Sequence, residues 1–248
     1  MQTILITGCS SGFGLETAKL FLARGWNVIA TMRTPSDILP LSANLRVLAL
    51  DVTDPASIAR VVDAAGPIDV LVNNAGLGML AAVEGLEMEK ARTLFETNTL
   101  GTIAMTQAVL PQMRARKAGV IVNVTSSVTM MTVPLLSVYK ASKAAVNAFT
   151  ECLAHEVAPF GIRTRIVLPG RAPDTRFRDN SQARMTGNEI PPAYDAVAQD
   201  LFAALTASGP VTTAEDVAEA VWQAATDPAS PLRLPAGADA LALAQAAA

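Results

Sequence analysis

Three side chains near the middle of the chain have the types and spacing to move a proton and hold an oxygen. Tyr139 precedes Lys143 by four residues, in Val-Tyr-Lys-Ala-Ser-Lys, and Ser126 lies thirteen residues before the tyrosine. Residues four apart are neighbours on a helix, so the lysine ammonium should lower the pKa of the phenol from its ordinary value of about 10. With the serine hydroxyl on a substrate oxygen, this set suits proton transfer to a carbonyl while a nicotinamide delivers hydride to its carbon.

A glycine-rich turn near the start of the chain could bind phosphate. Gly8, Gly12 and Gly14 lie between an expected strand and an expected helix. Glycine allows a sharp turn and a close approach to a pyrophosphate, and the helix N-terminus offers unpaired N–H groups. The spacing Gly-x-x-x-Gly-x-Gly differs from the common Gly-x-Gly-x-x-Gly fingerprint, and a tight turn without a ligand is the alternative. Three glycines at the first such turn favour dinucleotide binding.

The end of the second expected strand indicates which dinucleotide is bound. It ends at Arg33, and no acidic residue follows before Asp37. A site for NAD usually has a carboxylate here for the ribose 2′-hydroxyl, whereas an arginine suits the 2′-phosphate of NADP. Ser10 and Ser11 could add hydroxyl donors to the arginine fork. A solvated surface arginine is the alternative, but the missing acid predicts NADP.

Alternating short and long apolar segments must position these residues. They predict an α/β fold, a single Rossmann-like domain over residues 1–248 with a doubly wound parallel sheet and helices on both faces. Thr212 with Glu215 predicts a capping box, and residues 241–248 a surface helix or tail. The expected strands are 3–7, 26–32, 46–50, 68–72, 119–124 and 162–168; the expected helices lie near 14–24, 55–64, 87–115, 138–158 and 214–226.

Residues 170–210 lack clear periodicity and follow the sixth expected strand, where such a sheet binds ligands. We therefore expect a substrate-binding loop or lid there. Its apolar side chains either cover a hydrophobic substrate or only anchor the loop, and its arginines either bind an acidic substrate or form a solvated rim. The apolar residues are Phe177, Met185, Tyr194, Leu201 and Phe202, and the arginines are Arg171, Arg176, Arg178 and Arg184.

Composition narrows the class of protein further. Hydrophobic residues make up 51% of the 248 residues, and the net charge is -3 without a long basic run, so we expect neither nucleic acid nor membrane as a partner. No apolar run would span a bilayer, and the first strand begins almost at Met1, which predicts a cytoplasmic protein. Cys9 and Cys152 should be reduced thiols. His155, the only histidine, should be a surface residue, which leaves no zinc ligand set and no Ser-His-Asp hydrolase.

With these motifs assembled, the whole sequence resembles the short-chain dehydrogenase/reductase superfamily. It looks especially like the branch of type 1 17β-hydroxysteroid dehydrogenases and bacterial carbonyl reductases. The matching segments are Thr7-Gly-Cys-Ser-Ser-Gly-Phe-Gly14, Leu50-Asp-Val-Thr-Asp54, Asn73-Asn-Ala-Gly76, Asn98-Thr-Leu-Gly101, Ser126, Tyr139-x-x-x-Lys143 and Pro169-Gly170.

The resemblance implies a role for each matching residue. Tyr139 would be the catalytic acid or base, and Lys143 would hold the nicotinamide ribose. Ser126, rather than Ser127, would take the serine role, and Asn98 would hold a water in a proton relay. Asp51 and Val52 would bracket the adenine. The remaining expected cofactor contacts are Gly8, Ser10, Ser11, Gly12, Phe13, Gly14, Arg33, Asn74, Ala75, Gly76, Pro169, Gly170 and Thr175.

Two departures from the family pattern are visible. A threonine usually lies five positions after the proline, but Thr175 lies six after Pro169, which leaves its contact with the carboxamide open. Arg165 stands where the family often has asparagine. We expect an NADP(H)-dependent enzyme that reversibly reduces a ketone or aldehyde and forms a homo-oligomer, either a dimer or a tetramer. A non-catalytic NADP sensor and an epimerase or dehydratase are the alternatives.

Overall fold

One parallel sheet organises the computed structural model, which describes residues 1–175 and 189–246. Within these residues seven strands pair in the order β3-β2-β1-β4-β5-β6-β7. The chain therefore reverses its direction of winding between β1 and β4, which is where doubly wound sheets bind ligands. The strands are β1 (Thr3–Ile6), β2 (Asn27–Met32), β3 (Leu45–Ala49), β4 (Val70–Asn73), β5 (Gly119–Val124), β6 (Ile162–Pro169) and β7 (Arg233–Ala236).

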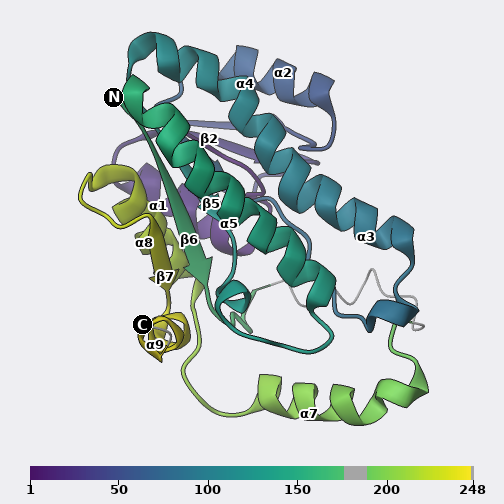
Figure 1. Cartoon of the computed structure of the whole chain (residues 1–248). Helices are drawn as coiled ribbons and strands as arrows, with labels where there is room; N and C mark the ends of the chain where they lie inside the picture. Colours follow the sequence, from purple (N-terminus) through teal and green to yellow (C-terminus); the bar gives the residue numbers. More distant parts are fainter. Residues whose placement is uncertain (176–188, 247–248) are drawn as a thin grey trace.

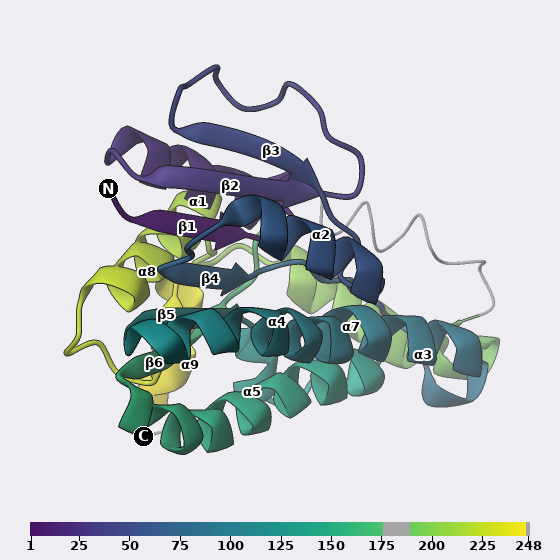
Figure 2. The same cartoon turned by 90° about the horizontal axis from the view of Figure 1, so that it is seen from above.

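Helices cover both faces of this sheet (Figures 1 and 2). Alternate strand residues supply two cores: Ile4 packs with the side of α1 and α8, and Leu5 with the side of α2, α4 and α5. Strands buried on both faces explain why their sequences are apolar throughout. The helices are α1 (Gly12–Ala23), α2 (Pro55–Ala65), α3 (Met88–Phe95), α4 (Gly101–Arg116), α5 (Ser137–Val157), α7 (Asp195–Thr206), α8 (Ala214–Thr226) and α9 (Ala238–Ala246).

An aromatic cluster fixes α1 against α8. The ring of Phe21 lies 5.1 Å from that of Trp26 and 5.0 Å from that of Trp222. The guanidinium of Arg24 lies 4.3 Å from the centre of the Trp222 ring. These contacts hold the helix that begins in the glycine-rich turn.

The six expected strands are confirmed to within two residues at each end, but β7 and α7 were missed. β7 contains Pro235, which cannot donate to a strand ladder, and it is tolerated because β7 is the edge strand. The helix α7 lies within residues 170–210, where we expected no regular structure. The alanine-rich end, where we expected a surface helix or tail from Leu241, forms the helix α9, which begins earlier, at Ala238.

Two details of the helices also differ from expectation. The expected helix 87–115 is divided by a π-helical turn at Glu96–Leu100. The capping box expected at Thr212 and Glu215 was wrong by one residue. Thr213 and Asp216 form it, since the Thr213 hydroxyl accepts from the Asp216 N–H at 3.1 Å. Thr212 is instead buried and bonded to the end of β6.

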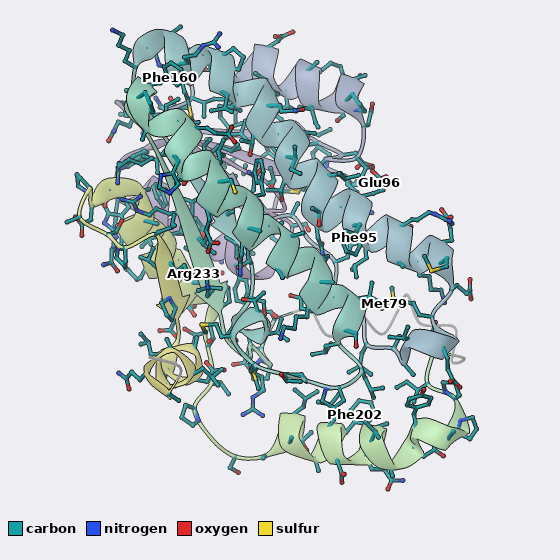
Figure 3. All side chains as sticks on the ribbon, in the orientation of Figure 1. Met79, Phe95, Glu96, Phe160, Phe202 and Arg233 are labelled. Carbon is teal, nitrogen blue, oxygen red and sulfur yellow. The ribbon has the colours of Figure 1, made fainter. Side chains whose placement is uncertain are left out.

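The carboxyl ends of the strands lie at one end of the molecule, toward the bottom of Figure 1, together with α7. Figure 3 shows Phe202 on α7 and Met79 at this end, and Phe160 at the opposite end. Among the described helices, none has the length and apolarity needed to cross a membrane.

Candidate active site at the carboxyl ends of the strands

The glycine-rich turn is pressed against the end of β4. Gly8 and Gly12 have φ of +75° and +56°, which glycine adopts without strain. A Cβ atom at Gly14 would lie 2.4 Å from the Gly8 carbonyl oxygen, so the turn has no room for one. The Asn74 Nδ2 donates to the carbonyls of Thr7 at 2.9 Å and Gly8 at 3.1 Å. The turn is therefore held in a shape that leaves backbone groups close to a ligand.

The same junction leads directly to the catalytic candidates. The Thr7 hydroxyl accepts from the N–H groups of Asn74 at 3.0 Å and Ala75 at 2.9 Å, which fixes the start of the Asn74–Gly76 segment. A Cβ atom at Gly76 would lie 3.2 Å from Lys143 Nζ and 3.3 Å from Asn98 Oδ1. The absence of a side chain at Gly76 therefore allows Lys143 and Asn98 to lie close to this backbone.

On the adenine side, Asp51 and Val52 follow the end of β3. The Asp51 carboxylate accepts from the Thr53 N–H at 2.9 Å and hydroxyl at 2.7 Å. These bonds, with a smaller contribution from the positive charge of Arg33, hold the pKa of Asp51 below its usual value. Arg33 is exposed at the end of β2. Ser10 is exposed, and Ser11 begins α1 without a side-chain capping bond.

Tyr139 lies in an apolar cluster with Met79, Leu94 and Val128, and only 8% of it is exposed. Burial raises the pKa of Tyr139 to about 12, partly offset by a hydrogen bond with the Ser126 side chain. The expected lowering of this pKa was wrong in direction, because apolar neighbours from distant segments remove water from the phenol. The phenol is therefore protonated at neutral pH.

Lys143 lies one turn further along α5 and is 5% exposed. Its ammonium donates to the Val124 carbonyl oxygen at 3.1 Å. Burial lowers the pKa of Lys143 to about 8. The lysine is thus anchored at the end of β5, close to Gly76.

Ser126 lies where β5 ends and begins the short 3₁₀ turn Ser127–Met130. Its Oγ accepts from the Val128 N–H at 3.2 Å. Ser127 is buried, whereas Ser126 is partly exposed and bonds with Tyr139. The structure therefore brings the expected serine, and not its neighbour, to the phenol.

Asn98 lies buried in the π-helical turn between α3 and α4. Its Nδ2 donates to Leu77 O at 2.9 Å and to Ser142 Oγ at 3.0 Å, and its Oδ1 accepts from the Leu77 N–H at 2.7 Å. Both amide hydrogens are used, so the side chain fixes Leu77 and α5. π-Helical turns are frequent at functional sites. Sequence reasoning missed this bracing of Leu77 and Ser142.

The segment after β6 returns to the glycine-rich turn. Thr175 lies against Gly12, since a Cβ atom added to Gly12 would be 3.5 Å from the Thr175 Cβ. The Thr175 hydroxyl donates to the Ala172 carbonyl at 2.9 Å. Pro169 and Gly170 begin this segment. Arg165, the departure noted above, donates to Ser230 Oγ at 2.8 Å and to Pro228 O at 3.1 Å, so it braces the turn before β7.

The described part of residues 170–210 separates its side chains into two groups. Leu201 is buried and Tyr194 partly buried, with Leu80 and Leu135, whereas Phe202 is 40% exposed and turned away. Arg171 bonds the carbonyls of Leu205 and Ala207 at the end of α7. Phe177, Met185, Arg176, Arg178 and Arg184 lie outside the described residues.

A cavity of about 220 Å³ adjoins the apolar cluster around Tyr139. Lys90, in its wall, forms an ion pair with Glu189, whose side chain is 1% exposed. Apart from Lys90 and Thr93, the lining of the cavity is apolar. Its lining residues are Leu77, Met79, Lys90, Thr93 and Leu94.

Two other residues have no place in this chemistry. Burial raises the pKa of the Cys9 thiol to about 12, so it is an inert packing group. His155 is exposed on α5, as expected. In residues 1–175 and 189–246 no three His, Cys, Asp or Glu side chains come together as a metal site would require.

Fold and site together define a doubly wound nucleotide-binding protein with a Ser-Tyr-Lys centre at the switch point of its sheet. The sequence model of the family described as short chain dehydrogenase matches residues 2–186. The chain belongs to this family, and it is an NAD(P)-dependent oxidoreductase.

Individual relatives agree with this assignment. A 3-ketodihydrosphingosine reductase of Bacteroides thetaiotaomicron is 40% identical over 191 residues, 75% of this chain and 70% of the reductase. For three other curated relatives the match covers 58% to 65% of the relative's length. A short-chain dehydrogenase structure from Streptomyces avermitilis has a TM-score of 0.85 at 33% identity, covering 99% of this chain and 91% of that one. A serine dehydrogenase complexed with NADP+ has a TM-score of 0.81 at 30% identity, covering 96% and 95%.

Proposed function

We propose that the chain reversibly reduces a ketone or aldehyde to an alcohol with NADP(H). The observation that carries this proposal is the hydrogen bond between Ser126 and Tyr139, with Lys143 one helical turn away and packed against Gly76. A sensor that only binds the dinucleotide would need neither Ser126 nor Tyr139. The glycine-rich turn, which excludes any Cβ atom at Gly14, fits a pyrophosphate.

The residues divide the chemistry among them. When bound, NADPH would supply a hydride to the carbonyl carbon. Tyr139, protonated because burial raises its pKa, donates its hydroxyl proton to the carbonyl oxygen. Ser126 donates a hydrogen bond to the same oxygen and stabilises its developing charge. The Lys143 ammonium then returns a proton to the tyrosinate through a water that Asn98 holds.

We further propose the binding residues for the cofactor. Lys143 holds the nicotinamide ribose, and Arg33 pairs with the 2′-phosphate. The glycine-rich turn with Ser10, Ser11 and Phe13 holds the pyrophosphate, and Asp51 and Val52 flank the adenine. Asn74, Ala75 and Gly76 line the adenosine side, whereas Pro169 and Gly170 face the nicotinamide. The contact of Thr175 with Gly12 supports a place beside the phosphates.

An apolar carbonyl compound is the substrate class that the described walls favour. Tyr139 lies among Met79, Leu94 and Val128, and the adjoining cavity has Lys90 as its charged residue, already paired with Glu189. The relative named 3-ketodihydrosphingosine reductase also supports a keto compound. We propose that residues 170–210 form the substrate loop of one domain in a cytoplasmic protein.

Loss of NADPH absorbance with a panel of ketones tests the function. We expect turnover with apolar ketones and at least about tenfold lower kcat/KM with ketones that carry a carboxylate, because no described wall residue is free to balance that charge. Higher kcat/KM for the acidic ketones would contradict the substrate class. Binding of NADPH without loss of its absorbance with any ketone would contradict the reductase and leave the sensor and the epimerase or dehydratase.

Arg33→Ala tests the preference for NADP. We expect the Kd of NADPH to rise about ten- to a hundredfold, as the loss of a charge-assisted bond to phosphate predicts, with little change for NADH. Fluorescence titration of both dinucleotides measures this. Arg60→Ala, which removes an exposed arginine paired with Asp54 at 3.7 Å, is the control. A wild-type chain that binds NADH more tightly than NADPH would contradict the preference.

We also propose a homo-oligomer, either a dimer or a tetramer, built on the face of α3 and the start of α5. A groove of about 300 Å³ there is lined by Arg92 and otherwise by apolar residues, of which Val83 and Met88 are more than 60% exposed. Such a contiguous apolar surface is typical of an interface. Light scattering that gives the mass of one chain, 25.8 kDa, would contradict it.

A further inference from the structure

The carboxylate of Asp239 joins the C-terminal helix α9 to the end of β6. Its Oδ2 accepts from the Arg171 N–H at 2.6 Å. Its Oδ1 accepts from the Thr212 hydroxyl at 2.6 Å. Bonds this short to a carboxylate are charge-assisted and stronger than those between neutral groups. They connect three segments that are far apart in the sequence.

Thr212 completes the connection from the other side. It is 2% exposed, and its Oγ accepts from the Gly170 N–H at 3.0 Å. Its own N–H donates to the Arg171 carbonyl at 2.8 Å. The backbone of Gly170 and Arg171, which we call the stem, is therefore held by Thr212 and Asp239 together.

The packing around the stem leaves no space for added atoms. A Cβ atom at Gly170 would lie 2.1 Å from Asp239 Oδ1. A Cβ atom at Gly237, whose φ is +92°, would lie 2.0 Å from Thr212 Oγ. Glycine at position 170 thus has a reason in this chain besides contact with a cofactor: it admits the carboxylate.

The helix that carries Asp239 also contacts the 3₁₀ turn Ser127–Met130, which has Ser126 as its N-cap. Figure 1 shows α9 beyond the end of β7, at the same end of the molecule as α7. One short helix therefore touches the turn that presents the serine and the stem that leaves β6. Asp239 and Thr212 both lie outside residues 2–186, the part matched by the family model.

We propose that Asp239 is a positioning residue that fixes the Gly170–Arg171 stem against the nicotinamide end of bound NADP(H). This rests on the proposed function, since the stem is its nicotinamide wall. A backbone held in place before binding does not have to be ordered by the ligand, so fixing the stem strengthens binding and aligns the reacting atoms. Asp239 itself does not touch the cofactor.

Two ligands separate this role from a general effect on folding. NADPH contains the nicotinamide end, and adenosine 2′,5′-bisphosphate has only the adenosine end. For Asp239→Ala we expect the Kd of NADPH to rise about tenfold and kcat to fall, with the Kd of the bisphosphate within about twofold of wild type. For Asp239→Asn the Kd of NADPH should lie between those of wild type and Asp239→Ala, because the amide keeps one acceptor oxygen for the two donors.

Leu241→Ala, at a residue 49% exposed on the same helix, should change neither Kd. If the Asp239 variants do not fold, Thr212→Val removes the hydroxyl between Asp239 and Gly170 and should show the same selective loss. Equal weakening of both ligands, or unchanged NADPH binding, would overturn the proposal. A wild-type chain that binds the bisphosphate but reduces no ketone would instead count against the proposed function.

Discussion

Replacing Tyr139 with phenylalanine is expected to lower kcat for ketone reduction by about a thousandfold, the contribution typical of a lost general acid together with its hydrogen bond. Phenylalanine fills the same place among Met79, Leu94 and Val128, so the apolar cluster stays packed. The Kd of NADPH should change by less than about threefold, because only one hydroxyl is removed. Steady-state rates and fluorescence titration give the two numbers.

The chain provides a matched control for this variant. Tyr194 is the other of its two tyrosines, and its hydroxyl donates to Glu84 at 3.1 Å, away from Ser126. Tyr194→Phe should keep a kcat within about threefold of wild type. If Tyr139→Phe retained more than about a tenth of the wild-type kcat, the assignment of the proton donor would be wrong.

Replacing Lys143 with methionine should have two opposite effects. We expect kcat to fall by about a hundredfold or more, since the group that holds the ribose and reprotonates the tyrosine is lost. We also expect the folded chain to become more stable at pH 7, by about 1–3 kcal/mol, because a buried charge without a carboxylate partner is replaced by an apolar side chain. Urea unfolding measures this free energy.

The pH dependence of that gain follows from the pKa of Lys143. Burial lowers it from 10.5 to about 8, so between these values the unfolded chain binds more protons than the folded one. The free energy of unfolding of the wild-type chain therefore rises between pH 8 and 10.5. Below pH 8 the penalty of the buried charge is fully present. The advantage of the variant should shrink across this window.

Lys140→Met is the control for the lysine variant. The Lys140 ammonium donates to the Met131 carbonyl at 2.7 Å on the exposed side of α5. This variant should show no pH-dependent gain in stability. A Lys143→Met chain that is less stable than wild type at pH 7, by an amount that does not vary with pH, would contradict the reasoning.

Local patterns in the sequence predicted most of the sheet and selected the candidate catalytic residues. Strands buried on both faces have continuous apolar runs, and the spacing between Tyr139 and Lys143 is a property of one helix. By contrast, β7 is short and contains Pro235, and its pairing depends on β6. Because β7 forms only by pairing with β6, no local pattern in its own sequence predicts the strand.

The features of the site that were missed also depend on distant segments. The direction of the Tyr139 pKa shift is set by Met79, Leu94 and Val128, which only the fold brings to the phenol. Thr212 and Asp239 belong to no recognised motif, and 27 residues separate them. Their hydrogen bond is a tertiary contact, and the residues next to Thr212 and Asp239 in the sequence do not predict it.

The placement of the aromatic cluster determines what intrinsic fluorescence can report. Both indoles of the chain, Trp26 and Trp222, pack on Phe21 of α1. Neither belongs to the apolar clusters around Tyr139 or beneath α7. A shift in tryptophan emission on adding a dinucleotide would therefore register the helix behind the glycine-rich turn. The substrate side has only Tyr139 and Tyr194 as intrinsic fluorophores, so a tryptophan signal from it requires a third indole.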